Sequence, residues 1–198
     1  MMRRLLVVVG LLVALGGIAI VSVGGPRLVF PAPPATSAAI AISDAAPARS
    51  ISVGSIMLCV SSGSTAVING VAIHDPVGPI QVEAFAVRPN PFTAGIEGLG
   101  SADATLAGYG RGFAPNVPQT VSGICRGDAA TTTADEAGSE SELGVQVRLL
   151  SEDIGGGHDL DVTYAIDGRV HVLSIPFGIW LCARTCPSDI NDPTRPPA

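Results

Sequence analysis

The sequence contains few of the residues and motifs that enzymes use for catalysis. All eleven basic residues are Arg, and the absence of Lys excludes lysine Schiff bases and the lysine of a phosphate-binding P-loop. None of the motifs Gly-x-Ser-x-Gly, Ser-x-x-Lys or His-Glu-x-x-His occurs. The three histidines, at expected turn or strand positions, are His74, His158 and His171. We therefore predict no catalytic residue and no cofactor, and an extracytoplasmic hydrolase that assembles a His, a Ser and a carboxylate in space is the alternative.

Four cysteines could form disulfides or bind a metal. In an oxidising compartment an even number of cysteines indicates disulfides, and four cysteines allow three pairings. We favour the pairing of Cys59 with Cys182, which would join the first and last strands, together with Cys125 and Cys186. The spacing of Cys182 and Cys186 is also compatible with zinc ligands, but no matching second pair exists. The sequence therefore predicts two disulfides and no metal site.

Two clusters of acidic residues could supply the oxygen ligands that calcium prefers. The first, in residues 127–147, comprises Asp128, Asp135, Glu136, Glu140 and Glu142. Its Ala, Thr, Gly and Ser neighbours are typical of a solvated loop. The second comprises Glu152, Asp153, Asp159 and Asp161. Because no Asp-x-Asp-x-Asp-Gly loop is present, a calcium-stabilised adhesion-type domain is only a second alternative function.

The connection 89–117 is the best candidate for a binding surface. It is rich in Gly and Pro, and a connection of this length in a compact domain usually has a function or structure of its own. Tyr and Arg are common anchors of protein interfaces. We predict that the contact residues are Phe92, Tyr109, Arg111 and Phe113. The alternative is that the aromatic rings fold back and cover the edge of the sheet.

The N-terminal segment predicts the compartment. Arg3 and Arg4 precede an uncharged run from Leu5 to Pro26, and about twenty apolar residues in a helix cross a hydrocarbon core of ~30 Å. Positive charge before the run places that end in the cytoplasm. We predict a transmembrane signal anchor over residues 1–25 with the remaining chain outside the cell membrane. The alternative is a cleaved signal peptide and secretion.

The rest of the chain divides into a linker, a domain and a tail. Residues 26–50 are rich in Pro and Ala and are typical of a semi-rigid linker, although Ile40–Ile42 could instead join the sheet as an edge strand. Residues 51–186 form the expected extracytoplasmic domain. Residues 187–198 are expected to be a flexible tail because they are rich in Pro.

The domain is expected to be an all-β, immunoglobulin-like β-sandwich of about seven strands. Its short β-branched runs are separated by Gly, Pro, Asn and Asp. The expected strands are Ile51–Val60, Thr65–Ile73, Ile80–Arg88, Gln119–Cys125, Leu143–Leu150, Leu160–Ile166 and Arg169–Leu181. The clearest period of two runs over residues 143–149, where Leu and Val alternate with Gly, Gln and Arg.

The pair Asp167 and Gly168 predicts a two-residue hairpin turn with positive φ at both positions. The turn sets the register of its strands, so that Ile166 faces Arg169 and Tyr164 faces His171. The apolar side chains then share one face of the hairpin, which must pack against another layer. Pro176 is expected to mark a bulge or an edge position in the last strand.

The stretch Phe85-Ala86-Val87-Arg88-Pro89-Asn90-Pro91-Phe92 ends a strand, because each Pro forces its predecessor into an extended conformation. With Cys59 before it and Ile175-Pro176-Phe177 leading to Leu181-Cys182 after it, the chain resembles a group of small secreted or membrane-anchored proteins of actinobacteria. The resemblance covers residues 55–182 and implies an extracytoplasmic location. It implies no site residue.

Composition and charge limit the functions that the protein can have. The formal net charge is −6, and from Ile51 onward seven Arg against sixteen acidic residues give −9. Nucleic acids are bound by clustered cations, so this balance argues against a nucleic-acid partner. We predict a non-catalytic binding or envelope-associated module. Its partners would be the membrane, through the N-terminal helix, and an extracytoplasmic protein or envelope component.

Overall fold

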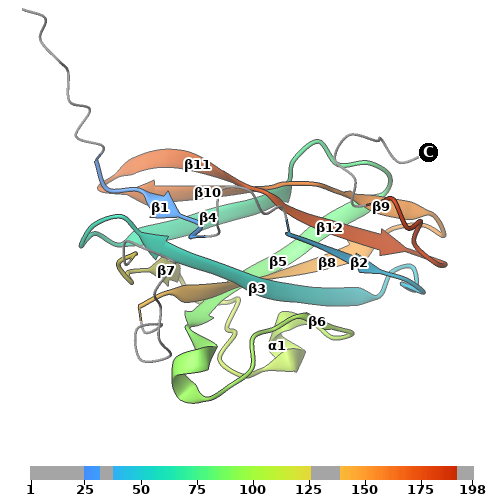
Figure 1. The fold of residues 1–198 in the computed structure, drawn as a ribbon, viewed down its shortest axis with the longest axis horizontal. Helices are drawn as coiled ribbons and strands as arrows, with labels where there is room; N and C mark the ends of the chain where they lie inside the picture. The colour runs from blue at the N-terminus through green and yellow to red at the C-terminus, as the bar shows by residue number, and fades with distance from the viewer. Residues whose placement is uncertain (1–24, 32–37, 126–138, 191–198) are drawn as a thin grey trace, which may run out of the picture.

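The computed structural model describes residues 25–31, 38–125 and 139–190 as an all-β protein (Figure 1). The five-stranded sheet has the order β1 (Leu28–Val29), β3 (Ser50–Val60), β8 (Ser141–Leu149) and β5 (Ile80–Pro89), with β6 (Ser101–Ala102) paired to β3. The four-stranded sheet has the order β11 (Arg169–Ile175), β10 (Leu160–Ile166), β4 (Ala66–Ile73) and β7 (Gln119–Val121). The three-stranded sheet has the order β2 (Ala38–Ile42), β12 (Phe177–Cys182) and β9 (Ile154–Gly157). The expected all-β class is therefore confirmed.

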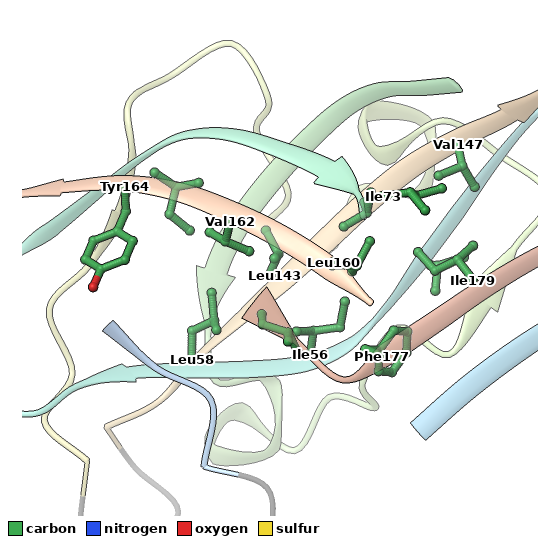
Figure 2. Close-up of a cluster of buried hydrophobic side chains, with 14 of the residues drawn as sticks. Ile56, Leu58, Ile73, Leu143, Val147, Leu160, Val162, Tyr164, Phe177 and Ile179 are labelled. Carbon is green, nitrogen blue, oxygen red and sulfur yellow. The ribbon is translucent and has the colours of Figure 1, made fainter. Parts of the chain in front are cut away.

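The main core lies between the five-stranded and four-stranded sheets. The strand period of two sends the apolar members of β10 inward, where Leu160, Val162 and Tyr164 are buried. Figure 2 shows these side chains facing Leu58 and Leu143 of the opposite sheet, with Phe177 and Ile179 of β12 closing one end of the core. The alternation expected over residues 143–149 places all four Leu and Val side chains of that stretch in this core.

The predicted hairpin is confirmed in turn type and register. Asp167 has φ 49° and Gly168 has φ 75°, which is the left-handed conformation that this two-residue turn requires. Ile166 pairs with Arg169, and the register continues to the pairing of Leu160 with Ile175. The turn therefore determines which side chains of β10 and β11 enter the core.

Pro176 separates two strands that were expected to be one. Proline has no backbone N–H for a β ladder, and the chain leaves the four-stranded sheet at this residue and enters the three-stranded sheet as β12. The carbonyl of Pro176 accepts a hydrogen bond from the Ala38 backbone N–H at 3.1 Å, and β2 then runs parallel to β12. Residues 38–42 of the expected linker, including the Ile40–Ile42 alternative, are thus part of the folded domain.

The two disulfides join Cys59 to Cys125 and Cys182 to Cys186. The favoured pairing of Cys59 with Cys182 is wrong, because β12 belongs to a sheet that does not contain β3. Residues 123–125 instead run beside the end of β3, where the Val60 N–H donates to the Gly123 carbonyl at 2.7 Å. All four cysteines are oxidised, as the sequence predicts.

In the described residues, no helix is long and apolar enough to cross a membrane. The two helical segments found there are η1 (Pro91–Ala94), a 3-10 turn, and α1 (Leu106–Tyr109). Nearly all of the expected anchor over residues 1–25 lies outside the described residues, as do residues 191–198 of the expected tail.

The two disulfides should differ in their effect on stability. The Cys59–Cys125 bridge spans 66 residues and the Cys182–Cys186 bridge spans 4. On the chain-entropy model, removing them should cost about 4 and about 2 kcal/mol respectively. Urea unfolding of the two double Cys→Ala variants measures the difference, each variant serving as the control for the other. Equal losses would show that loop length does not determine the contribution of these bridges.

Candidate functional site

A buried ion pair lies on the outer face of the five-stranded sheet. Arg88 of β5 and Glu142 of β8 are register partners, and their side chains are 2% and 0% exposed. Arg88 donates to Glu142 Oε2 from Nε at 2.7 Å and from Nη2 at 2.6 Å. Removing two charges from water is costly, and it is offset only where good geometry and further hydrogen bonds satisfy the remaining atoms.

Backbone groups of the connection 89–117 supply most of those further hydrogen bonds, and Ser55 of β3 supplies one. Glu142 Oε1 accepts from the Leu99 N–H at 2.7 Å and from the Ser55 N–H at 2.8 Å. The Arg88 guanidinium donates to the Arg111 carbonyl at 2.7 Å and to the Glu97 carbonyl at 3.0 Å. The ion pair therefore ties two separate stretches of the connection to β5 and β8.

The connection also forms a small core with β5. Its buried residues are Ala86 of β5 and Leu99, Leu106 and Phe113 of the connection, and Tyr109 packs against them. The Arg88 guanidinium lies 4.5 Å from the centroid of the Phe113 ring, a cation–π contact that adds to the ion pair. Figure 1 shows β6 and α1 beneath the five-stranded sheet. The connection thus covers the outer face of this sheet.

The four predicted contact residues have different environments. Phe92 in η1 is 57% exposed, and Phe113 is 5% exposed within the small core. Tyr109 is half-buried and Arg111 is exposed, with the Arg111 guanidinium 5.7 Å from the Tyr109 ring centroid. The structure therefore leaves Phe92, Tyr109 and Arg111 accessible. Phe113 adopts the alternative arrangement, in which a ring packs back onto the sheet.

The sequence reasoning missed the role of Glu142. It placed this residue with Glu140 in a solvated acidic loop, whereas Glu142 is fully buried in β8; Asp128, Asp135 and Glu136 lie outside the described residues. A signal was present in the small residues Ala86 and Gly144, which are register partners next to the ion pair. Small residues on a strand face indicate that another segment approaches closely.

The expected strand end at the Arg-Pro-Asn-Pro stretch is observed. Strand β5 ends at Pro89, and the Asn90 side chain caps η1 by accepting from the Phe92 N–H at 2.9 Å. Thr93 Oγ1 donates to the Asn90 carbonyl at 2.8 Å. The stretch therefore supplies both the buried cation and the turn that begins the connection.

A polar pocket of about 450 Å³ lies where β5 ends and β8 begins. Its lining also includes residues of β7 and of the segment that follows it. We name it the hydroxyl pocket after its polar residues, which are Asn90, Thr93, Thr120, Ser122, Ser139 and Ser141. Nothing in the sequence pattern singles out these residues, because they come from three segments far apart along the chain.

A second polar cluster, near the junction of β4, β10 and β11, contains His74, Asp161 and Ser174. His74 Nδ1 lies 2.7 Å from Asp161 Oδ2, and the Ser174 hydroxyl donates to Asp161 Oδ1 at 2.9 Å. A serine nucleophile must pass its proton to the histidine, but the Ser174 hydroxyl donates to the carboxylate of Asp161 instead. These three residues therefore do not form the arrangement that the hydrolase alternative requires.

The two remaining histidines have structural contacts. His171 stacks on Tyr164 with ring centroids 5.3 Å apart, as expected from the hairpin register. His158 makes an edge contact with Trp180 at 5.1 Å. Among the residues that the structure describes, no group of three or more His, Cys, Asp or Glu side chains could hold a metal ion.

Comparison with known proteins adds no assignment. No protein-family model matches the chain, and none of the curated proteins is similar to it.

The ion pair should make a large contribution to stability. Glu142→Gln keeps the shape but leaves Arg88 buried without a carboxylate, and the loss of one partner of a buried pair typically costs about 3–5 kcal/mol. Asp103→Asn is the control, because it breaks the exposed pair of Arg49 and Asp103, which should contribute about 0–1 kcal/mol. Urea unfolding measures both variants, and similar small losses would contradict the role of Glu142.

The His74 cluster should titrate in a coupled way. The hydrogen bond to Asp161, the charge of that carboxylate and the charge of Asp75 raise the pKa of His74 above its ordinary 6.5. The bond of protonated His74 therefore adds stability below pH 6.5, and this stability is lost as the pH rises through the raised pKa. Asp161→Asn should lower the midpoint of the His74 titration in NMR spectra, whereas Asp103→Asn should not. An unchanged midpoint in Asp161→Asn would refute the coupling.

Proposed function

We propose that the protein is a non-catalytic binding module, held on the outer side of a membrane by its N-terminal apolar segment. Its contact face is the exposed side of the connection 89–117, formed by Phe92, Tyr109 and Arg111. The proposed partner is an extracytoplasmic protein or another envelope component. Phe113 supports the face from beneath rather than touching the partner, because its ring is buried against Arg88.

One observation carries this proposal: the connection is tied to the sheet by a buried ion pair. A loop that is ordered before binding loses less conformational entropy when a partner docks, so its contacts contribute more to affinity. The carbonyl of Arg111 is bound by Arg88, and the N–H of Leu99 is bound by Glu142. A mobile connection would need no such anchoring, whereas a binding surface gains affinity from it.

The proposed location rests on the cysteines and on the N-terminal sequence. Disulfides persist in oxidising compartments and are rare in the cytosol, and this chain has two. The uncharged run after Arg3 and Arg4 is long enough for a membrane span. The resemblance to small secreted or membrane-anchored actinobacterial proteins supports the same compartment. The two facing sheets are consistent with an immunoglobulin-like sandwich, an architecture frequent among cell-surface domains.

Site-specific photo-crosslinking of the full chain tests the contact face. A photoreactive phenylalanine analogue in place of Phe92 should give one discrete adduct in native membranes. The same analogue at Val172, which is 62% exposed on the other sheet, should give none. Arg111→Ala should remove the adduct without lowering the melting temperature, because its side chain is exposed. Phe113→Ala should destabilise the fold by about 3–5 kcal/mol.

The same experiment can overturn the proposal in two ways. Identical adducts from positions 92 and 172, or none from position 92, would show that the connection is not a specific contact face. Recovery of the full-length chain in the cytosolic fraction with reduced cysteines would contradict the proposed location.

A further inference from the structure

The hydroxyl pocket is unusual in the chemistry of its lining. Its volume of about 450 Å³ lies within the range of about 300–1,000 Å³ that small-molecule sites occupy, but such sites are mostly apolar. Here five hydroxyl side chains and one amide surround the space; they are Thr93, Thr120, Ser122, Ser139, Ser141 and Asn90. A lining of this kind suits a ligand that carries many hydrogen-bonding groups.

The charges around the pocket exclude an anionic ligand. Of the residues that line it, only Arg88 and Glu140 are charged. The guanidinium of Arg88 is already bound to Glu142, Arg111 and Glu97, so the described lining residues offer no free cation to a phosphate or carboxylate. The balance of −9 from Ile51 onward also repels anions.

Hydroxyl groups favour a neutral ligand rich in hydroxyls. A Ser or Thr hydroxyl can donate one hydrogen bond and accept others, so it matches the neighbouring hydroxyls of a sugar ring in either role. The carboxylate of Glu140 adds a charge-assisted acceptor, which forms stronger hydrogen bonds than a neutral group. The hydroxyls of Thr93 and Ser139 already donate to the carbonyls of Asn90 and Ile124, so they would accept hydrogen bonds from a ligand. Together with Thr120, Ser122 and Ser141, they could bind several hydroxyls of one ring at the same time.

The walls of the pocket are held in place before any ligand binds. Strand β8 fixes Ser141, which is paired with Pro89 of β5 and with Leu58 of β3. On the opposite wall, the Cys59–Cys125 disulfide and the Val60–Gly123 hydrogen bond hold the segment after β7 against β3. Preorganised polar groups lose little entropy on binding.

We propose that the hydroxyl pocket is a binding site for a short neutral glycan. The proposal goes beyond the contact face, because none of the three contact residues lines the pocket. The two proposals can therefore fail independently. A glycan site on an extracytoplasmic module would bring the protein to carbohydrate on the envelope or the cell surface.

Titration of the isotope-labelled full chain with neutral disaccharides tests this site. The probes are maltose, cellobiose and chitobiose, and the detergent must lack a sugar headgroup. At least one probe should shift the amide resonances of Thr93, Thr120 and Ser141 in a saturable way. The double variant Thr120→Val/Ser141→Ala removes two hydroxyls and should bind that probe at least tenfold more weakly. Thr163→Val, on β10 of the same sheet as Thr120, is the matched control and should bind as the wild type does.

Three outcomes would overturn the proposal. One is that no disaccharide shifts these resonances at millimolar concentration. Another is that inorganic phosphate or calcium chloride produces the shifts and the disaccharides do not. A third is that the double variant, with an unchanged melting temperature, binds the sugar as well as Thr163→Val does.

Discussion

The ion pair between Arg88 and Glu142 is the constraint on which the outer layer of this protein depends. Two charges are buried where the connection 89–117 crosses the sheet. Backbone groups of that connection supply three of the further hydrogen bonds of the pair, and the Ser55 N–H of β3 supplies another. If the connection moved away, the pair would lose those three partners in a site of low exposure, which is costly. The connection and the pair therefore stabilise each other. Apolar replacements of buried ion pairs often preserve stability. The presence of this pair is therefore better explained by its effect on conformation, because it holds the connection in one arrangement.

The end of β5 relates the two proposed binding sites. The Arg88 side chain holds the connection by donating to the carbonyls of Arg111 and Glu97. Two residues later, Asn90 caps η1 and lines the hydroxyl pocket. The Asn90 N–H also donates to the Glu140 carbonyl at 3.1 Å, which joins the start of the connection to the start of β8. One strand end thus helps to position both the partly apolar proposed contact face and the polar pocket.

The parts of the fold that depend on local chemistry could be predicted from the sequence. The Asp167–Gly168 turn determines its own register, and the period of two over residues 143–149 follows from which face is buried. The cysteine pairing and the burial of Glu142 depend on which distant segments meet, and local patterns do not contain that information. The sequence did not distinguish Glu142 from its acidic neighbours, because its partner Arg88 lies 54 residues away along the chain. Pro176 was recognised as an interruption, but the change of sheet that it produces depends on β2 and β9.

The two outer faces of the sandwich differ in a way that explains where the connection packs. On the five-stranded sheet, a Cβ on Gly144 would lie 2.7 Å from Leu106 and 2.8 Å from Phe113, so only a glycine admits the small core at this distance. On the four-stranded sheet, Val170 and Val172 of β11 project outward and are 68% and 62% exposed. Small residues therefore create the space that the connection fills, and Arg88 and Glu142 supply its anchors at the edge of that space. Because the sheet, the ion pair and the connection depend on one another, the proposed contact face is part of the folded domain and not a loop attached to it.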